Sequence, residues 1–246
     1  MKILVAVSKA PDTTSKISFT DNNTKFNEAG IQFIVNPYDE WYALVRGLEL
    51  KEANGGTVTT ITVGGPDADP IIRKALAIGA DDAVRIDANP TDAYFVATQI
   101  SEYAKDKGYD MILVGKETVD YNGSQVGGLI AGMLDLPYLP NTSKLDVSGS
   151  TATIERDVQS GEEVMEAQLP IVLSASKGMA EQRIPNMRGI MAARTKKLEV
   201  VPAFAGEALT EILDYTLPPA KSAVKLINPE NAGELIQLLH TEAKVI

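Results

Sequence analysis

Two glycine-bearing turns carry the residues best suited to bind a ligand. The first is the Gly-Gly-Pro-Asp run at residues 64–67, and the second spans residues 115–125. Each turn follows an apolar, β-branched run and precedes a segment of helical periodicity. At the carboxyl ends of parallel strands, helix N-termini offer free N–H groups and a partial positive charge to a phosphate. The two turns therefore indicate a nucleotide-phosphate site.

Neither turn is a nucleotide-binding fingerprint in the strict sense. There is no G-x-G-x-x-G after the first apolar run and no G-x-x-x-x-G-K-[ST] in the chain. For Gly64, Gly65 or Gly115 taken singly, a tight strand-to-helix turn is explanation enough. The binding hypothesis rests on the two turns together.

Side chains for catalysis are scarce. The chain has no cysteine, which excludes thiolate nucleophiles, disulfides and sulfur-based metal sites. Its single histidine, His240, lies near the C-terminus in a helix-like tail and is most simply an exposed tail residue. Carboxylates and lysines remain, without a conspicuous pair for acid–base work. We therefore expect a binding protein with no metal site and no turnover of its own.

The net charge limits the classes of partner that the protein can bind. The formal net charge of −10 over 246 residues argues against a nucleic acid or an anionic membrane surface, and an acidic surface suits basic protein partners better. The apolar run at residues 3–7 is too short for a signal sequence or a membrane span. We expect a cytoplasmic protein without direct membrane insertion.

The elements that must position the two turns alternate between strand and helix, which is typical of an α/β fold with a doubly wound parallel sheet. Asn36, just before Pro37, is interpreted as the cap of the first helix. Residues 15–35 are expected to form a β excursion around an Asp-Asn-Asn turn at 21–23. Strands are predicted at residues 2–8, 57–63, 82–87 and 111–115, and helices at 39–53, 68–78, 93–107 and 125–134.

The second half changes from this alternation to strand–turn–strand. We predict an antiparallel extension with strands at 144–147, 152–157, 163–168 and 171–175. Residues 177–193 are polar, contain glycine and proline, and are interpreted as a loop that awaits a partner. Residues 201–246 have too few apolar residues for a domain and are predicted to be an arm with a short helix at 229–241. The domain that precedes the arm is residues 1–200.

A series of short segments, in order along nearly the whole chain, resembles the beta subunit of electron-transfer flavoproteins. Each segment is short, and their joint order is what makes the resemblance specific. They are ILVAV at 3–7, NPYDE at 36–40, GP at 65–66, RKALAIGAD at 73–81, GK at 115–116, QVG at 125–127, GEEVME at 161–166, LP at 169–170, EQR at 181–183 and IMAA at 190–193.

The resemblance implies a carrier subunit rather than an enzyme. In that family the beta subunit pairs with an alpha subunit that carries a redox-active FAD. The heterodimer takes electrons from acyl-CoA or other dehydrogenases and passes them to a membrane quinone reductase or another acceptor. The beta subunit usually binds a structural AMP, which we expect here. In electron-bifurcating relatives a second FAD takes that place, and this remains the alternative within the family.

The resemblance also assigns the cofactor-binding residues. AMP-type relatives commonly have Asn-Gln-Thr where this chain has Ser-Gln-Val at 124–126, so two side-chain contacts differ. Backbone N–H groups at a helix start need no particular side chain to bind phosphate. The expected lining is Ala6, Asn36, Gly64 and Gly115 around the adenosine, and Ser124, Gln125, Val126 and Gly127 around the phosphate.

Residues 177–183 align with the family's partner-recognition loop, in which an apolar anchor enters a pocket on the dehydrogenase. The anchor position falls on Met179, with Glu181 and Arg183 beside it. A methionine suits varied pockets because its side chain adapts its shape. Inward packing of Met179 is the alternative. The usual Asn-Glu-Pro-Arg is Ala-Glu-Gln-Arg here, so we expect a different partner choice.

Two further function classes compete with this interpretation. A free-standing adenine-nucleotide-binding regulator, similar in fold to universal stress proteins, would explain the first half of the chain but neither the loop nor the arm. A nucleotide hydrolase would need a nucleophile-and-base pair, which the sequence does not display.

Overall fold

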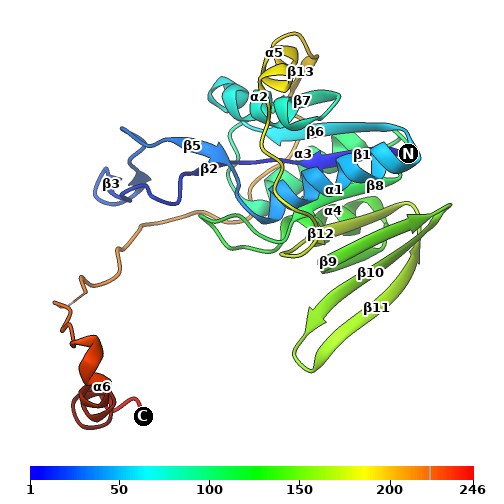
Figure 1. Cartoon of the computed structure of the whole chain (residues 1–246). Helices are drawn as coiled ribbons and strands as arrows, with labels where there is room; N and C mark the ends of the chain where they lie inside the picture. The colour runs from blue at the N-terminus through cyan, green and yellow to red at the C-terminus, as the bar shows by residue number, and fades with distance from the viewer. Residues whose placement is uncertain (222) are drawn as a thin grey trace.

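The computed structural model describes residues 1–221 and 223–246, and over these the chain forms a large, mostly parallel sheet with helices on both faces (Figure 1). Nine strands lie in the order β11-β10-β9-β12-β8-β1-β6-β7-β13. Their bounds are Lys2–Ala6 (β1), Thr57–Val63 (β6), Asp82–Asp87 (β7), Met111–Gly115 (β8), Tyr138–Ser148 (β9), Thr151–Val158 (β10), Gly161–Gln168 (β11), Ile171–Ala175 (β12) and Leu198–Pro202 (β13).

Pairing within the sheet follows the predicted change from parallel to antiparallel. β1 pairs in parallel with β6 and β8, β12 with β8 and β9, and β7 with β6 and β13. β10 pairs antiparallel with β9 and β11. The doubly wound α/β fold is confirmed, and β9, β10 and β11 form the antiparallel extension. The strand predicted at 171–175 as part of that extension is instead parallel to both of its neighbours. β13 continues the sheet to Pro202, slightly past the predicted domain end at residue 200.

Helices cover both faces of the sheet, and the sheet separates two hydrophobic cores. One core gathers side chains from α1, α2 and α5, and the other from α3 and α4. The third helix ends earlier than the predicted residue 107, because the backbone of Asp106 turns to a positive φ. The helices are Asp39–Asn54 (α1), Asp69–Ile78 (α2, preceded by a 3₁₀ turn at Pro66–Ala68), Ala93–Ala104 (α3), Val126–Leu134 (α4), Met187–Ala193 (α5) and Ala232–Leu238 (α6). Within the described ranges, no helix has the length and apolar character needed to cross a membrane.

The winding reverses at β1. From β1 the chain passes through α1 and α2 to β6 and β7 on one side, and α3 then carries it back to β8 on the other side. Ligands of open α/β sheets bind outside the carboxyl ends of the strands at such a reversal. The carboxyl ends of β1, β6 and β8 therefore define the candidate site.

A small hairpin projects beside these strand ends. β3 (Phe19–Thr20) pairs antiparallel with β4 (Lys25–Phe26), and all three residues at 21–23 have positive φ. Asn and Asp tolerate this conformation because their short side chains bond locally. The predicted β excursion is confirmed. Its base is the antiparallel pair of β2 (Lys9–Pro11) and β5 (Phe33–Val35).

The chain leaves the sheet after Pro202 and ends in a separate helical piece (Figure 1, orange to red). This piece comprises a 3₁₀ turn at Pro229–Asn231, α6 and a π-helical turn at Leu239–Ala243, which bears out the helix predicted at 229–241. Residues 203–246 are called the arm below.

Candidate functional site

The strand ends at the reversal bring together the glycines and Ala6 singled out in the sequence. Ala6 ends β1, Gly115 ends β8, and Gly64 follows β6 with its N–H bonded to the Ile86 carbonyl oxygen at 3.0 Å. Ala6 shares a hydrophobic cluster with Val126 at the start of α4. The predicted adenosine side and the predicted phosphate side therefore lie at one edge of the sheet.

Gln125 occupies the position predicted for it, at the N-terminus of α4. It is the N-cap residue, and its side chain makes no capping hydrogen bond. The first helical N–H groups of any α-helix lack intrahelical partners and are free to bind an anion. Ser124, just before, has φ of 52° and donates its hydroxyl to Glu117 Oε2 at 3.3 Å. In this arrangement its side chain points back to Glu117, at the other end of the same loop, residues 116–124.

Gly127 lets α4 approach the sheet closely. A Cβ at this position would lie 2.8 Å from Val114 Cγ2 and from the Tyr138 ring. Such distances are far below ordinary carbon–carbon contact, so only glycine fits without moving the helix. The start of α4, with its free N–H groups, is thereby held against the end of β8.

Asn36 does not cap α1, contrary to the prediction. Its fully buried side chain donates to the Glu117 carbonyl oxygen at 3.1 Å and accepts from the Val119 N–H at 3.0 Å. The N-cap residue of α1 is Tyr38, with φ of 64° and no side-chain cap bond. Asn36 instead fixes the loop at 116–124, a partnership that no local pattern around residue 36 reveals.

A buried carboxyl group lies between the ends of β1 and β8, and sequence reasoning missed it. Glu40 is 6% exposed, and its carboxyl accepts from the Ser8 N–H at 2.7 Å and from the Ser8 hydroxyl at 2.8 Å. Burial raises the pKa of Glu40 to about 8, against the lowering effect of the Ser8 hydrogen bonds. A Cβ on Gly115 would lie 2.7 Å from Glu40 Cγ. The available signal was that residue 40 falls on the same helical face as the apolar residues 44 and 48.

A cavity of about 370 Å³ adjoins this edge, between the start of α1 and the loop at 116–124. Lys116 and Lys177 bring positive charge to it, and Lys116 Nζ lies 3.2 Å from Glu117 Oε1. Burial raises the pKa of Asp39 in its wall, while Lys116 lowers it. The lining residues are Pro37, Tyr38, Asp39, Tyr42, Lys116, Glu117, Val119, Asn122 and Lys177. The cavity connects the predicted nucleotide loop with the first residue of the predicted partner loop.

Met179 is not exposed as a docking anchor would have to be, so that expectation is wrong. It is 5% exposed and belongs to the core that includes α1 and β12. Gly178, with φ of 104°, turns the chain inward just before it. The cause is burial against elements distant in sequence, which the polar neighbours of Met179 conceal.

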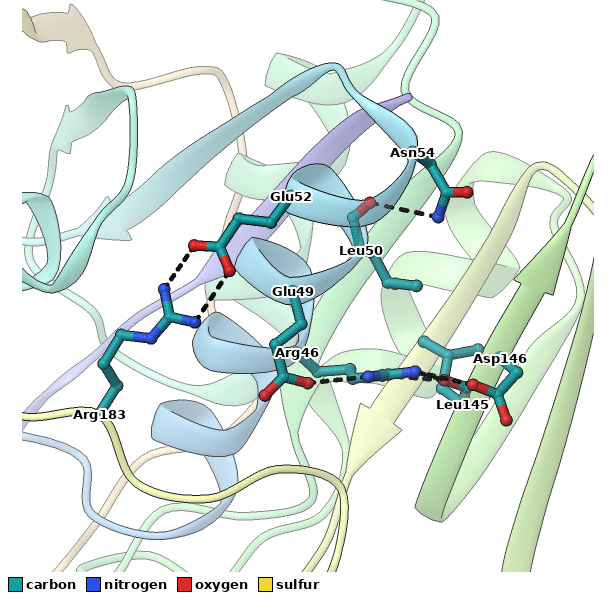
Figure 2. Close-up of polar contacts among 8 residues, drawn as sticks. All are labelled: Arg46, Glu49, Leu50, Glu52, Asn54, Leu145, Asp146 and Arg183. Carbon is teal, nitrogen blue, oxygen red and sulfur yellow. Dashed lines mark hydrogen bonds and ion pairs between the residues drawn. The ribbon is translucent and has the colours of Figure 1, made fainter.

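Arg183 is fixed to the outside of α1. Its guanidinium makes two bonds to the Glu52 carboxylate, at 2.7 and 3.1 Å, and its carbonyl oxygen accepts from Trp41 Nε1 at 3.2 Å. Figure 2 shows the paired Arg183–Glu52 contact beside the bonds of Arg46 to Leu145 and Asp146 on β9. Glu181 lies exposed earlier in the loop. The segment is thus braced at residues 179 and 183 before it turns outward.

Apolar side chains beyond this brace face solvent. Ile184 is 81% exposed and Met187 is 73% exposed, and Ile190 and Met191 follow on α5. The spacing at 187, 190 and 191 places three of them on one side of a short helix. The segment that carries them is basic in sequence, because residues 177–197 contain Lys177, Arg183, Arg188, Arg194, Lys196 and Lys197 but a single carboxylate, Glu181.

Known proteins are similar to this sequence over most or all of its length. The model of the electron transfer flavoprotein domain matches residues 23–205. The chain is 37% identical to the electron transfer flavoprotein subunit beta of Bacillus subtilis, with 100% of both chains covered. It is 36% identical to the protein of that description from Syntrophomonas wolfei, covering 91% of this chain and 88% of the relative. With the human protein of that description it shares 30% identity over 91% of each chain.

Proposed function

The chain belongs to the beta-subunit family of electron transfer flavoproteins, and on this premise we propose that it is the AMP-binding half of a heterodimer whose alpha subunit carries the redox-active FAD. In this role it supports electron transfer without turnover of its own. The observation that carries the proposal is the start of α4, held by Gly127 against the strand ends at the reversal of the sheet. Free N–H groups at this position suit one phosphate.

Charge at the turn at residues 64–67 supports AMP over FAD. The 3₁₀ turn and α2 that follow Gly64 begin with Asp67 and Asp69, so that helix start already holds negative charge. Lys9 forms an ion pair with Asp67 and lowers the pKa of that carboxyl. A dinucleotide brings a second phosphate, and these carboxylates would repel it.

The nearby arginine is not available to offset that repulsion. Arg85 is buried, donates to the Gly64 carbonyl oxygen at 2.9 Å, and lies 2.6 Å from Asp87 Oδ1. Its Nε lies 2.8 Å from Asp69 Oδ1, close enough for an ion pair although the two atoms are not aligned for a hydrogen bond. With two carboxylates already beside it, Arg85 offers little to a phosphate.

The decisive experiment is to denature the purified protein and identify the nucleotide released. AMP supports the proposal, FAD supports the bifurcating alternative, and release of neither nucleotide contradicts both. Gly127→Ala should then abolish retention of the nucleotide, because the added methyl group pushes α4 away from β8. Gly132→Ala, in the same helix but with open space at its Cβ, is the matched control and should retain the nucleotide.

We further propose that a donor protein, an acyl-CoA or other dehydrogenase, docks on residues 177–193, and that a quinone reductase or another acceptor receives the electrons. Ile184 and Met187 take the place that Met179 was expected to fill, because they are the most exposed of the large apolar side chains there. Ile184→Ala should raise the carrier concentration needed for half-maximal reduction by the donor and leave the flavin spectrum unchanged. A changed spectrum with unchanged half-saturation would contradict this docking role.

The arm is proposed to pack on the alpha subunit. Large apolar side chains along it are exposed, with Val224 at 81% and Leu226 at 89%. Segments of this kind are stabilised when a partner covers them. A chain shortened to residues 1–215 should keep its nucleotide but lose heterodimer formation in size-exclusion chromatography. Normal pairing of the shortened chain would count against the arm's role.

A further inference from the structure

Three segments that are distant in the sequence meet where the arm leaves the body. The ring of Phe19, from the β3–β4 hairpin, stacks on the ring of Tyr215 in the arm, with centroids 4.7 Å apart and planes 10° from parallel. The Tyr215 N–H donates to the Asn23 carbonyl oxygen at 2.8 Å. Tyr121, from the loop at 116–124, completes the group. We call Phe19, Asn23, Tyr121 and Tyr215 the arm clasp.

Tyr121 is the third aromatic residue of the clasp. Its side chain is exposed for the most part, yet burial raises the pKa of Tyr121, and the neighbouring Tyr215 phenol raises it further. Tyr121 is therefore a neighbour of Tyr215 at the exposed edge of the clasp. The clasp accordingly has one strong contact, the Phe19–Tyr215 stack, and one lateral neighbour.

The arm clasp is the last of three attachments of the arm to the body. The first is a reciprocal pair of hydrogen bonds: the Gln99 side chain donates to the Phe204 carbonyl oxygen at 2.9 Å and accepts from the Phe204 N–H at 2.7 Å. In the second, Asp92 accepts from the N–H groups of Leu209 and Thr210. Past Tyr215, the hydrogen bonds and ion pairs of the described arm residues stay within the arm, as between Lys225 and Glu242.

The outer arm, residues 216–221 and 223–246, therefore extends away from the clasp, as the orange-to-red trace in Figure 1 shows. It carries exposed apolar side chains to its last residue, Ile246. The direction in which the chain leaves Tyr215 decides where these side chains can reach. A small rotation at the root of a long segment produces a large displacement at its end.

We propose that the arm clasp is a hinge that aims the outer arm at the partner subunit, so that assembly starts from a pre-positioned segment. The proposal rests on the proposed function, since the partner is the flavin-carrying alpha subunit. Pre-positioning raises the fraction of molecules that are competent to bind and lowers the cost of ordering the segment at the moment of contact. Phe19 and Tyr215 are positioning residues in this scheme.

The test measures the association rate constant of the full-length chain with its alpha subunit by stopped-flow flavin fluorescence. Tyr215→Ala and Phe19→Ala should each slow association about fivefold, which corresponds to about 1 kcal/mol, a typical free energy for an aromatic pair. Tyr215→Phe preserves the stacked ring and is the matched control, with an expected rate close to that of the unaltered chain. Unchanged association in both Ala variants, or an effect confined to the dissociation rate of Tyr215→Ala, would overturn the proposal.

A second measurement needs no partner. Because the chain has no cysteine, Lys105→Cys on the body and Glu234→Cys on the arm can carry spin labels for a distance distribution. Loss of the Phe19–Tyr215 stack should broaden this distribution and leave the thermal unfolding of the body unchanged. An equally broad distribution with the stack intact would refute the hinge. If the unaltered chain pairs with no alpha subunit, the proposed function fails, and the distance measurement still decides the hinge.

Discussion

Glu40 offers a quantitative test of the buried site edge. Its carboxyl is enclosed between the ends of β1 and β8 and has a pKa of about 8, because burial disfavours its charged form. In the unfolded chain the same group has a pKa near its ordinary value of 4.5. The contribution of Glu40 to stability is therefore fully present below pH 4.5 and is lost as the pH rises toward 8.

The size of the loss follows from the two pKa values. Above pH 4.5 the unfolded chain releases a proton that the folded chain retains, and each pH unit then costs about 1.4 kcal/mol of the free energy of unfolding. By pH 7 the loss amounts to about 3 kcal/mol. Glu40→Gln removes the titration, and its amide can accept from the Ser8 N–H and donate to the Ser8 hydroxyl, which keeps both contacts.

The assay is urea unfolding at intervals from pH 5 to pH 8.5. The unaltered chain should lose stability with rising pH, whereas Glu40→Gln should show a flatter profile and exceed it by about 3 kcal/mol near pH 7. His240→Gln, which removes the exposed tail histidine, is the control and should leave the profile unchanged. If Glu40→Gln keeps the full pH dependence, or is less stable than the unaltered chain at pH 8, Glu40 is an ionised carboxylate stabilised by Ser8, and the reasoning fails.

Three further substitutions test other contacts. Gly115→Ala should destabilise the chain by about 1–3 kcal/mol, because the added Cβ would press on Glu40. Urea unfolding checks this, with Gly132→Ala as the control, and equal stabilities of the two variants would refute the close approach. Glu52→Gln should loosen the Arg183 segment and raise the carrier concentration needed for half-maximal reduction by the donor, without altering the maximal rate. The fluorescence of Trp41, the single tryptophan, reports the loosening directly. A lower maximal rate at an unchanged half-saturating concentration would contradict this prediction. Asp92→Ala should lower the free energy of unfolding by about 1 kcal/mol, because it removes the hydrogen bond that caps α3 at the Phe95 N–H. It should also speed proteolysis at residues 205–215, and unchanged cleavage would show that Asp92 does not hold the arm.

The sequence predicted well whatever depended on local pattern. The apolar runs and helical periods placed β6, β7, β8 and β12 at their observed bounds, and the Asp-Asn-Asn turn located the β3–β4 hairpin. Gln125 at the start of α4 followed from the loop-to-helix transition after β8. Such features are set by a few neighbouring residues, so their signals are contained in the sequence window itself.

The failures at Asn36, Met179 and Glu40 involve partners far away in the chain. Asn36 had the residue type and position of a helix cap, but its amide bonds to residues 117 and 119, more than eighty positions later. Met179 lies among polar residues, yet it packs into the core. Glu40 looked like an ordinary acidic residue in the first turn of a helix and is buried by the approach of Gly115. Tertiary contacts of this range overrode local preference in each case.

The position of β13 has a consequence for the order in which the chain can fold during synthesis. β7 lies at the edge of the parallel strands until Leu198–Pro202 pairs with it, so a nascent chain carries an open edge while more than a hundred residues are still being added. Open edges invite pairing with other chains. Charged residues at 82, 85 and 87 protect this one, because flanking charges oppose contact between like strands. The sheet is completed only as the root of the arm emerges, so a stalled chain that ends before residue 198 should be prone to aggregation.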